Sequence, residues 1–354
     1  MKLLTKYILS KYLKNFFIIL ISLEIFFVGF DSLQNLDSLP SSANLMLLYF
    51  MYNIFFILTI TLPLSILFAW IVTLAFMVKE NTLISFYALG ATKKQVLVPI
   101  IFISFVLTSF LIGMQTTSLA YSYENKQKIL NNMFFVNEKQ NILLTYNNNF
   151  IYFKKLYPIK KKAEGIKIFK LKNKQVVEVI EAKKAYYQND KWYIIEAKII
   201  SKPEKIYWDS SKLTVSHEKF LYTLEGFKPE VINNVYQTRV QYSISDALYT
   251  IFLFDEQGLN TDKIRAMLYS KLFIPFFVLP MLILLFVFSG ISGRFFKMGN
   301  FISLGVLVVL ASWGIMFLFQ KISVANVVIP EIGLLLPLGL FFIIAIYFYN
   351  KRVA

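Results

Sequence analysis

The sequence predicts an α-helical polytopic membrane protein, with three transmembrane helices before and three after a central β-rich domain. Three observations predict this architecture. Only 16% of the 354 residues are charged and 57% are hydrophobic, whereas soluble chains carry roughly a quarter of charged residues. The apolar residues gather in six stretches, and each can cross a ~30 Å hydrocarbon core, which takes about 20 helical residues. The long segment between the third and fourth stretches is polar and charged.

The six predicted spans follow one another along the chain. They cover roughly residues 13–34, 46–78, 96–119, 268–290, 301–321 and 328–349. The first is expected to stay in the protein, because no small-residue cleavage site follows it. The second is longer than one crossing needs, so we expect it to tilt or to extend beyond the bilayer. Prolines predict kinks, which membrane helices tolerate when neighbours satisfy the freed carbonyls, at Pro63, Pro275, Pro280 and Pro337.

The basic residues predict the orientation of these spans. Eleven of them fall at the two termini and in the loops 79–95 and 290–300, and the short loops 35–45 and 322–327 carry none. The eleven are Lys2, Lys6, Lys11, Lys14, Lys79, Lys93, Lys94, Arg294, Lys297, Lys351 and Arg352. Because cytoplasmic loops are enriched in Lys and Arg, we place both termini in the cytoplasm and the central domain outside. The net charge of +16 therefore indicates topology and anionic lipid, and we expect no nucleic-acid partner.

The composition excludes several kinds of catalytic site. The absence of cysteine excludes disulfides, zinc–thiolate sites and thiol nucleophiles. His217, the only histidine, leaves almost no room for a histidine-built metal site, and we expect it on the surface of a strand or turn. The sequence has no G-x-x-x-x-G-K-[ST] loop. We therefore expect no cofactor and no catalysis by this chain, and any ATP must be hydrolysed by another one.

The central domain, residues 121–265, is predicted to be a β-sandwich or a jelly-roll-like sheet. Short apolar strands at about ten-residue spacing indicate this, beginning with 149–153 and 175–180. Residues 185–187 and 192–195 form a candidate hairpin around the turn 188–190. A helical connector is predicted near 243–264, with Ser245 as a possible cap of its first helix.

The cytoplasmic segment between the second and third spans, residues 79–95, predicts a short amphipathic helix. Leu83, Ile84, Tyr87 and Ala88 fall at helical spacing, Gly90 is suited to end the helix in the left-handed conformation, and Thr92 to cap the next helix. Two interpretations remain open on spacing alone. The helix either connects two spans or inserts into a groove on a partner.

Acidic residues in the first span need a separate explanation. Glu24 lies inside the apolar stretch, where an acid is costly and often functional. It either faces a cavity or a partner's lysine, or packs at a helix interface. Asp31, near the outer end, is expected to be solvated, and Lys271 in the fourth span to snorkel to the interface. The aromatic residues of this span either face lipid or line an apolar cleft.

Several motifs resemble the LptF/LptG (YjgP/YjgQ) family, the permeases of the lipopolysaccharide export transporter, and the resemblance covers nearly the whole chain. The shared arrangement is three spans, an external β domain and three spans. Similar motifs are Thr5-Lys6-Tyr7-Ile8, Leu62-Pro63-Leu64, Asn149 to Tyr152, and the set Ala182, Ala185, Tyr187 and Trp192. Further motifs are similar to the LptG branch in particular: Tyr242-Ser243-Ile244, Met298-Gly299, Gly305, Pro330, Gly333 and Pro337.

The resemblance implies a permease subunit that extracts lipopolysaccharide from the bacterial inner membrane, with its β domain in the periplasm. It implies four kinds of partner: an LptB-like ATPase dimer, an LptF-like second six-span permease, an LptC/LptA-like periplasmic bridge, and the lipopolysaccharide itself. Residues 79–92 would be the helix that couples the permease to the ATPase, with Leu83, Tyr87, Ala88 and Gly90 at the docking site. Spans one and five would form the lateral gate of an apolar cavity, with candidates Glu24, Phe26, Phe27, Phe30 and Trp313.

Two departures from the family pattern bear on function. The family has a glutamate eight residues before the glycine, where this chain has Thr82, and Glu80 lies two positions earlier. Lysines that meet lipid phosphates in some LptG proteins have no counterpart between Phe16 and Pro40. The main alternative is a permease or mechanotransmission subunit of another envelope ABC system, with a lipoprotein or other lipid as cargo. A transport-free scaffold and a membrane-embedded enzyme are further alternatives.

Overall fold

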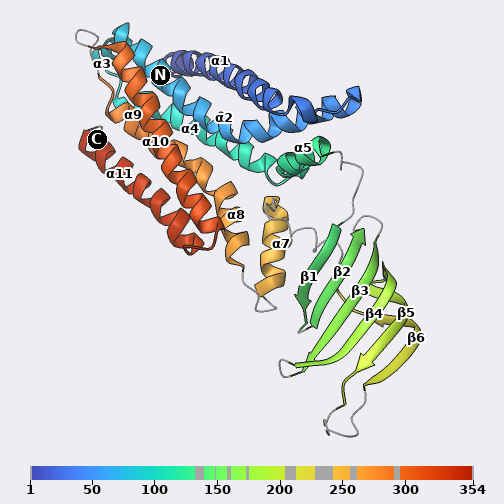
Figure 1. Cartoon of the computed structure of the whole chain (residues 1–354). Coiled ribbons are helices and arrows are strands. Elements are labelled where there is room, and N and C mark those ends of the chain that lie inside the picture. The colour runs from blue at the N-terminus through green and yellow to red at the C-terminus, as the bar shows by residue number, and fades with distance from the viewer. Residues whose placement is uncertain are drawn as a thin grey trace. The chain divides into compact units, whose positions relative to one another are not determined.

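The computed structural model describes residues 2–131, 139–147, 149–157, 161–172, 175–203, 213–227, 242–255, 261–290 and 296–352. The chain divides into two compact units. The first, helical unit joins Met1–Asn131 to Gln241–Ala354, and the second, Asn132–Val240, carries a β-sheet. Figure 1 shows the helices and strands of each unit.

The first part of the helical unit contains three long helices, which match the first three predicted spans. They are α1 (Lys2–Gln34), α2 (Ala43–Lys79) and α4 (Lys93–Met114). The short helix α3 (Thr82–Ala88) connects α2 to α4. Short turns η1 (Leu36–Ser38) and η2 (Ser118–Tyr121) follow α1 and α4, and α5 (Ser122–Leu130) completes this part.

The second part of the helical unit supplies the remaining spans. It consists of α7 (Ile244–Asp255), α8 (Asp262–Leu272), η3 (Ile274–Phe277), α9 (Val278–Val287), α10 (Met298–Val324), the π-helical turn η4 (Glu331–Leu335) and α11 (Leu336–Arg352). Five helices of the described chain are long and apolar enough to cross a membrane. A sixth crossing is formed if Asp262–Leu272 and Ile274–Val287, bent by 43° at their junction, count as one span. The bend lies where Pro275 predicts a kink, whereas Pro63 lies inside the continuous helix α2.

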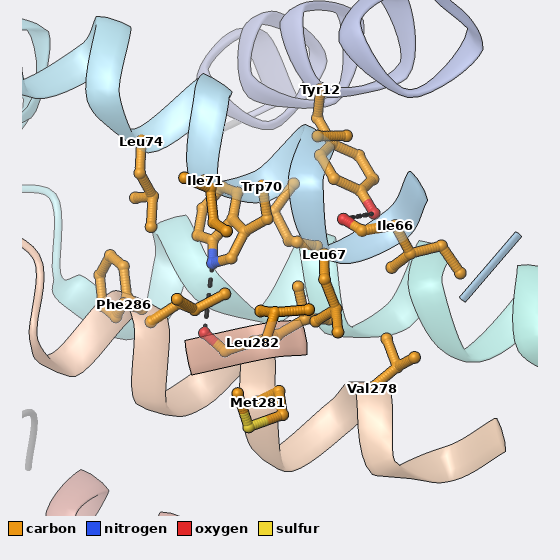
Figure 2. Packing of buried hydrophobic residues seen from close by; sticks show 14 of the residues in the cluster. Tyr12, Ile66, Leu67, Trp70, Ile71, Leu74, Val278, Met281, Leu282 and Phe286 are labelled. Atoms are coloured by element: carbon orange, nitrogen blue, oxygen red, sulfur yellow. Dashed lines mark hydrogen bonds between the residues drawn. The ribbon is translucent and has the colours of Figure 1, made fainter. Parts of the chain in front are cut away.

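Helix α2 lies at the centre of the helical unit, because it carries buried apolar residues on all of its sides. Of the 18 residues that form the most apolar stretch of α2, 61% are buried, whereas only 6% are buried in the corresponding stretch of α1. Figure 2 shows how its middle is fixed: Trp70 Nε1 donates to the Leu282 carbonyl at 3.2 Å, and the Tyr12 hydroxyl donates to the Ile66 carbonyl at 3.2 Å. The Trp70 ring also stacks on Phe286. These hydrogen bonds satisfy buried polar groups, so they fix the register between α1, α2 and α9.

The second unit contains six antiparallel strands among its described residues. They are β1 (Lys139–Tyr146), β2 (Asn149–Tyr157), β3 (Lys162–Lys172), β4 (Gln175–Gln188), β5 (Lys191–Ser201) and β6 (Thr214–Thr223). They pair in chain order, and their inward residues, such as Phe153 and Trp192, form a separate core. The described strands thus form one meander and not the crossed strand order of a jelly roll, which regular strand spacing alone does not distinguish. His217 is exposed on β6, as predicted.

The predicted hairpin is confirmed at the β4–β5 turn. Gln188 pairs with Lys191, which leaves a two-residue loop of Asn189 and Asp190. Both have positive φ angles, 48° and 62°, as a type I′ turn requires. Asn and Asp tolerate this conformation better than most residues, so the turn was visible in the sequence.

The helical unit is larger than the predicted domain borders imply. The predicted central domain of residues 121–265 is longer than the sheet-bearing unit, since α5, α7 and the start of α8 belong to the helical unit. The first helix of the predicted connector near 243–264 is present as α7, but its capping residue differs from the prediction. The Asp246 N–H donates to Ser243 Oγ at 3.1 Å, and Ser245 Oγ instead donates to the Thr116 carbonyl.

Candidate functional site

The cytoplasmic segment predicted between the second and third spans is a short helix with two well-defined ends. Before α3, Asn81 turns the chain with φ 56°. After it, Gly90 has φ 82°, and the Gly90 and Ala91 N–H groups donate to the Tyr87 and Phe86 carbonyls, both at 3.0 Å. These are the two hydrogen bonds of a Schellman motif, whose left-handed position favours glycine. The left-handed helix end predicted at Gly90 is confirmed.

The start of α4 is fixed by a capping box. The Gln95 N–H donates to Thr92 Oγ1 at 3.3 Å, and the Thr92 N–H donates to Gln95 Oε1 at 3.1 Å. The cap predicted at Thr92 is therefore confirmed. Because two otherwise unpaired N–H groups are satisfied reciprocally, the loop between α3 and α4 is held in a defined path.

Helix α3 buries one side and exposes the other. Leu83 is buried, and Tyr87 is partly buried against the same core, where burial raises the pKa of its hydroxyl to about 12. Ala88 and Gly90 are exposed. The predicted docking residues therefore divide: Leu83 and Tyr87 anchor α3 on its own chain, and Ala88 and Gly90 face outward. Sequence reasoning missed Leu89, which is 84% exposed beside Gly90.

Glu80 is engaged by its own chain. It caps the end of α2, and its Oε2 lies 2.6 Å from Lys11 Nζ on α1. Thr82, where the resemblance predicts a glutamate, is the first residue of α3 and is partly buried. Glu80 is the acid nearest to Thr82, and it links α1 to α2.

Glu24 lies at the interface between α1 and α2. Thr61 Oγ1 donates to Glu24 Oε1, and Oε2 is buried without a hydrogen-bond partner in the described part of the chain. Of the two interpretations left open, this geometry favours helix packing over an open cavity. A hydroxyl partner on the neighbouring helix reduces the cost of placing an acid in an apolar span.

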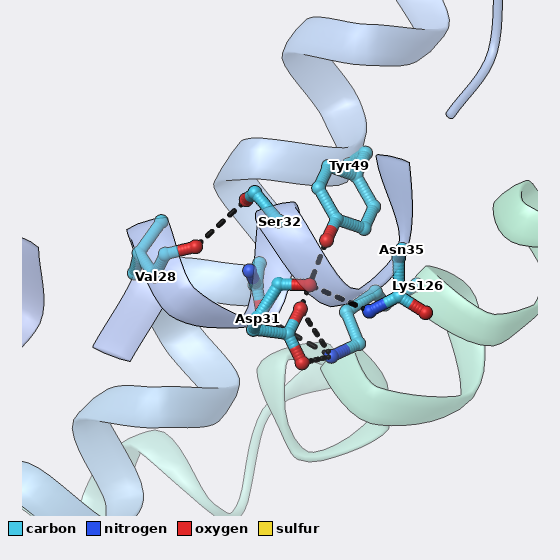
Figure 3. A network of polar contacts seen from close by, with 7 residues as sticks. Val28, Asp31, Ser32, Asn35, Tyr49 and Lys126 are labelled. Atoms are coloured by element: carbon cyan, nitrogen blue, oxygen red, sulfur yellow. Dashed lines mark hydrogen bonds and ion pairs between the residues drawn. The ribbon is translucent and has the colours of Figure 1, made fainter. Parts of the chain in front are cut away.

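A polar network at the end of α1 was not predicted. Asp31, expected to be solvated, pairs with Lys126 of α5 and accepts a hydrogen bond from the Tyr49 hydroxyl at 2.8 Å (Figure 3). Lys126 is 2% exposed and also donates to Asn53 Oδ1 at 3.2 Å. A buried lysine requires such a counter-charge. The available signal was an acid in the last turns of an apolar helix and a lysine in the polar helix after the third span.

The family is decided by a match that covers nearly the whole chain. The model of the lipopolysaccharide export system permease LptF/LptG matches residues 6–351. The chain belongs to the LptF/LptG family. No curated protein matches it. Family membership makes it an inner-membrane permease of lipopolysaccharide export, a protein class that works with an ABC ATPase and other Lpt proteins.

The aromatic residues predicted at the permease's lateral gate lie on two helices. Phe26, Phe27 and Phe30 are all exposed on α1, and the rings of Phe26 and Phe30 stack with centroids 6.3 Å apart. Trp313 on α10 is partly buried and stacks on Phe317 of its own helix. The phenylalanines thus present an open aromatic surface, while the ring contact of Trp313 is made within α10.

A second polar cluster in the permease's helical unit lies where η2, α7 and α8 meet. Tyr121 donates to the Asp246 carboxylate, and Ser243 Oγ donates to the same group at 2.7 Å. Burial, together with Asp246, raises the pKa of Tyr121 to about 12, so this hydroxyl remains a donor at neutral pH. Lys271, predicted to snorkel, is partly buried and donates to the Tyr242 carbonyl at 2.6 Å. The cluster joins η2, α7 and α8.

Proposed function

We propose that this permease is one of two six-span subunits that together extract lipopolysaccharide from the inner membrane, driven by a separate ATPase that docks on α3. The observation that carries the proposal is the exposed tip of α3, Ala88 to Gly90. A Schellman motif holds this tip, a capping box follows it at the start of α4, and Leu83 packs in the core formed around α2, so a force applied there reaches α2 and α4. The chain itself carries out no catalysis in this proposal.

The distribution of basic residues supports the orientation in this proposal. The termini and the loop containing α3 face the cytoplasm, and the sheet unit lies in the periplasm, where it passes lipid to an LptC/LptA-like bridge. The ATPase is an LptB-like dimer and the second permease is LptF-like, because the late motifs from Met298 to Pro337 resemble the LptG branch.

The transport step is physical. Removing a lipid with several acyl chains from the bilayer exposes methylene groups, each worth about 0.8 kcal/mol in transfer free energy. An apolar cavity between the two permeases, bordered by Phe26, Phe27 and Phe30, avoids most of that cost. ATP-driven closure of the ATPase dimer, transmitted through α3, then expels the lipid toward the periplasmic unit.

Purification of the tagged chain from its native membrane in mild detergent tests the proposal, with mass spectrometry of the co-purifying proteins and lipids. We expect a soluble ATPase, a second six-span permease and lipopolysaccharide. Leu89→Glu should release the ATPase and leave the second permease bound. Leu36→Glu is the matched control, because Leu36 is exposed on η1 at the opposite end of α1.

Two results would contradict this function. If the ATPase stays bound to Leu89→Glu, α3 is not its docking site. If a lipoprotein or a phospholipid co-purifies in place of lipopolysaccharide, the alternative envelope transporter is the better assignment.

A further inference from the structure

A groove of about 1310 Å³ lies beside α3, between the beginning of α1 and the first turns of α4. Its walls are mostly apolar and include Leu3, Leu4, Phe86 and Val98. Two charged side chains line it, Lys6 from α1 and Lys94 from α4, and both are exposed. No acidic side chain is among its lining residues. The groove therefore combines a mostly apolar lining with two lysines and, among the described residues that line it, no carboxylate to neutralise them.

An apolar stripe continues from this groove along α4. Val98 is 47% exposed, and Phe102, Val106 and Phe110 follow at intervals of four residues, exposed by 67%, 42% and 62%. Residues four apart are neighbours on a helix surface, rotated by only about 40°, so these four form a stripe that winds slowly around α4. The twelve-residue interval from Val98 to Phe110 covers about 18 Å at a helical rise of 1.5 Å. One leaflet of a ~30 Å hydrocarbon core is about 15 Å thick, so the stripe spans one leaflet.

We propose that this groove binds the headgroup of an anionic phospholipid of the inner leaflet, with an acyl chain lying along the stripe of α4. Lys6 and Lys94 contact the phosphate, and the groove wall takes the glycerol and the first methylenes. The inference rests on the orientation in the proposed function, which puts this end of α1 and α4 at the cytoplasmic surface. That leaflet surface is negatively charged and attracts lysine side chains.

A phospholipid fits this groove better than a protein segment does. The two lysines stand at the ends of membrane-spanning helices, where the bilayer supplies a high local concentration of anionic headgroups. The apolar stripe continues into the span and not along α3. Leu89, Gly90 and Thr92 line the same groove, so the bound lipid contacts the proposed ATPase-docking tip.

Native mass spectrometry of the purified full chain in detergent tests this inference, with added phosphatidylglycerol or with phosphatidylcholine of identical acyl chains. The wild type should bind phosphatidylglycerol more tightly. The double variant Lys6→Gln with Lys94→Gln should bind it about 30-fold more weakly, since two interfacial lysine contacts are lost. Val98→Asp should weaken binding of the same lipid by placing a charge in the apolar wall.

The matched control is Lys14→Gln with Lys351→Gln, which removes the same charge from exposed lysines outside the groove and should keep wild-type binding. Equal binding of the two lipids, or wild-type binding by the Lys6 and Lys94 double variant, overturns the proposal. So does protection of both lysines from acetylation by the ATPase but not by phosphatidylglycerol, which makes the groove a protein-docking site. The lipid titration contains neither ATPase nor lipopolysaccharide, so its result is separable from failure of the export function.

Discussion

Lys126 Nζ on α5 donates to both carboxylate oxygens of Asp31 on α1, at 2.8 and 3.0 Å. The lysine is almost fully buried, and the Tyr49 hydroxyl donates to the same carboxylate. The network therefore joins α1, α2 and α5 through one charge pair. Helix α1 buries little of its apolar surface within the chain, so polar contacts of this kind matter for its position.

Asp31→Asn should destabilise the protein strongly, because it leaves Lys126 buried without a counter-charge. Loss of one partner from a buried ion pair costs about 3–5 kcal/mol. Replacement of both partners, Asp31→Asn with Lys126→Met, should recover part of the loss, since no buried charge remains. Thermal unfolding of the purified variants in detergent, followed by circular dichroism, measures the effect. A double variant no more stable than Asp31→Asn would show that the penalty does not come from the unpaired lysine.

Glu80→Gln should have a small effect by comparison. Its partner Lys11 is 32% exposed and Glu80 itself 48%, and ion pairs in such positions contribute roughly 0–1 kcal/mol. The same unfolding experiment should show a change well below that of Asp31→Asn. Recovery of the ATPase with Glu80→Gln should also be unchanged, because Glu80 is already bound by Lys11. Loss of the ATPase from this stable variant would instead assign Glu80 to the docking contact.

The features that the sequence predicted correctly are those with local signals. The long apolar stretches predicted the membrane helices, the Asn189-Asp190 turn predicted a hairpin, and Gly90 and Thr92 predicted the ends of their helices. Each of these depends on residues within a few positions of one another. Hydropathy and turn chemistry act within such short segments, so the local structures that they favour form independently of distant contacts.

The missed features depend on contacts between distant residues. Asp31 and Lys126 are 95 positions apart, so their pairing required knowledge of how α5 packs on α1 and α2. Ser243 rather than Ser245 caps α7 because Ser243 lies beside Tyr121 and Asp246, and Tyr121 is 122 positions away in the sequence. The division of α3 into an anchoring side and an exposed tip required knowing which side faces α2. Hydropathy and turn chemistry do not show which of these distant residues meet in the folded chain.

Gly90→Ala should loosen the end of α3 without creating a clash. No atom lies within 4 Å of an added Cβ, so the cost is that of a left-handed conformation for a residue other than glycine, about 1 kcal/mol. Hydrogen exchange of the Gly90 and Ala91 amides should then be about fivefold faster. Gly29→Ala is the control, because Gly29 lies inside α1 and also has free space around it. An unchanged amide exchange rate in the Gly90→Ala variant would mean that the Schellman motif does not hold this loop.

Gly333→Ala should disrupt the packing between α10 and the π-helical turn before α11. A Cβ at this position would lie 2.0 Å from Ser323 Oγ, which cannot be accommodated without movement. The Ser323 hydroxyl is buried and has no hydrogen-bond partner in the described residues, so Ser323→Ala alone should be nearly neutral. The double variant should recover most of the melting temperature that Gly333→Ala loses, because its closest contact becomes the Ser323 Cβ position at 3.3 Å. Gly339→Ala, with open space around it, should melt like the wild type, and a double variant as unstable as Gly333→Ala would contradict this packing.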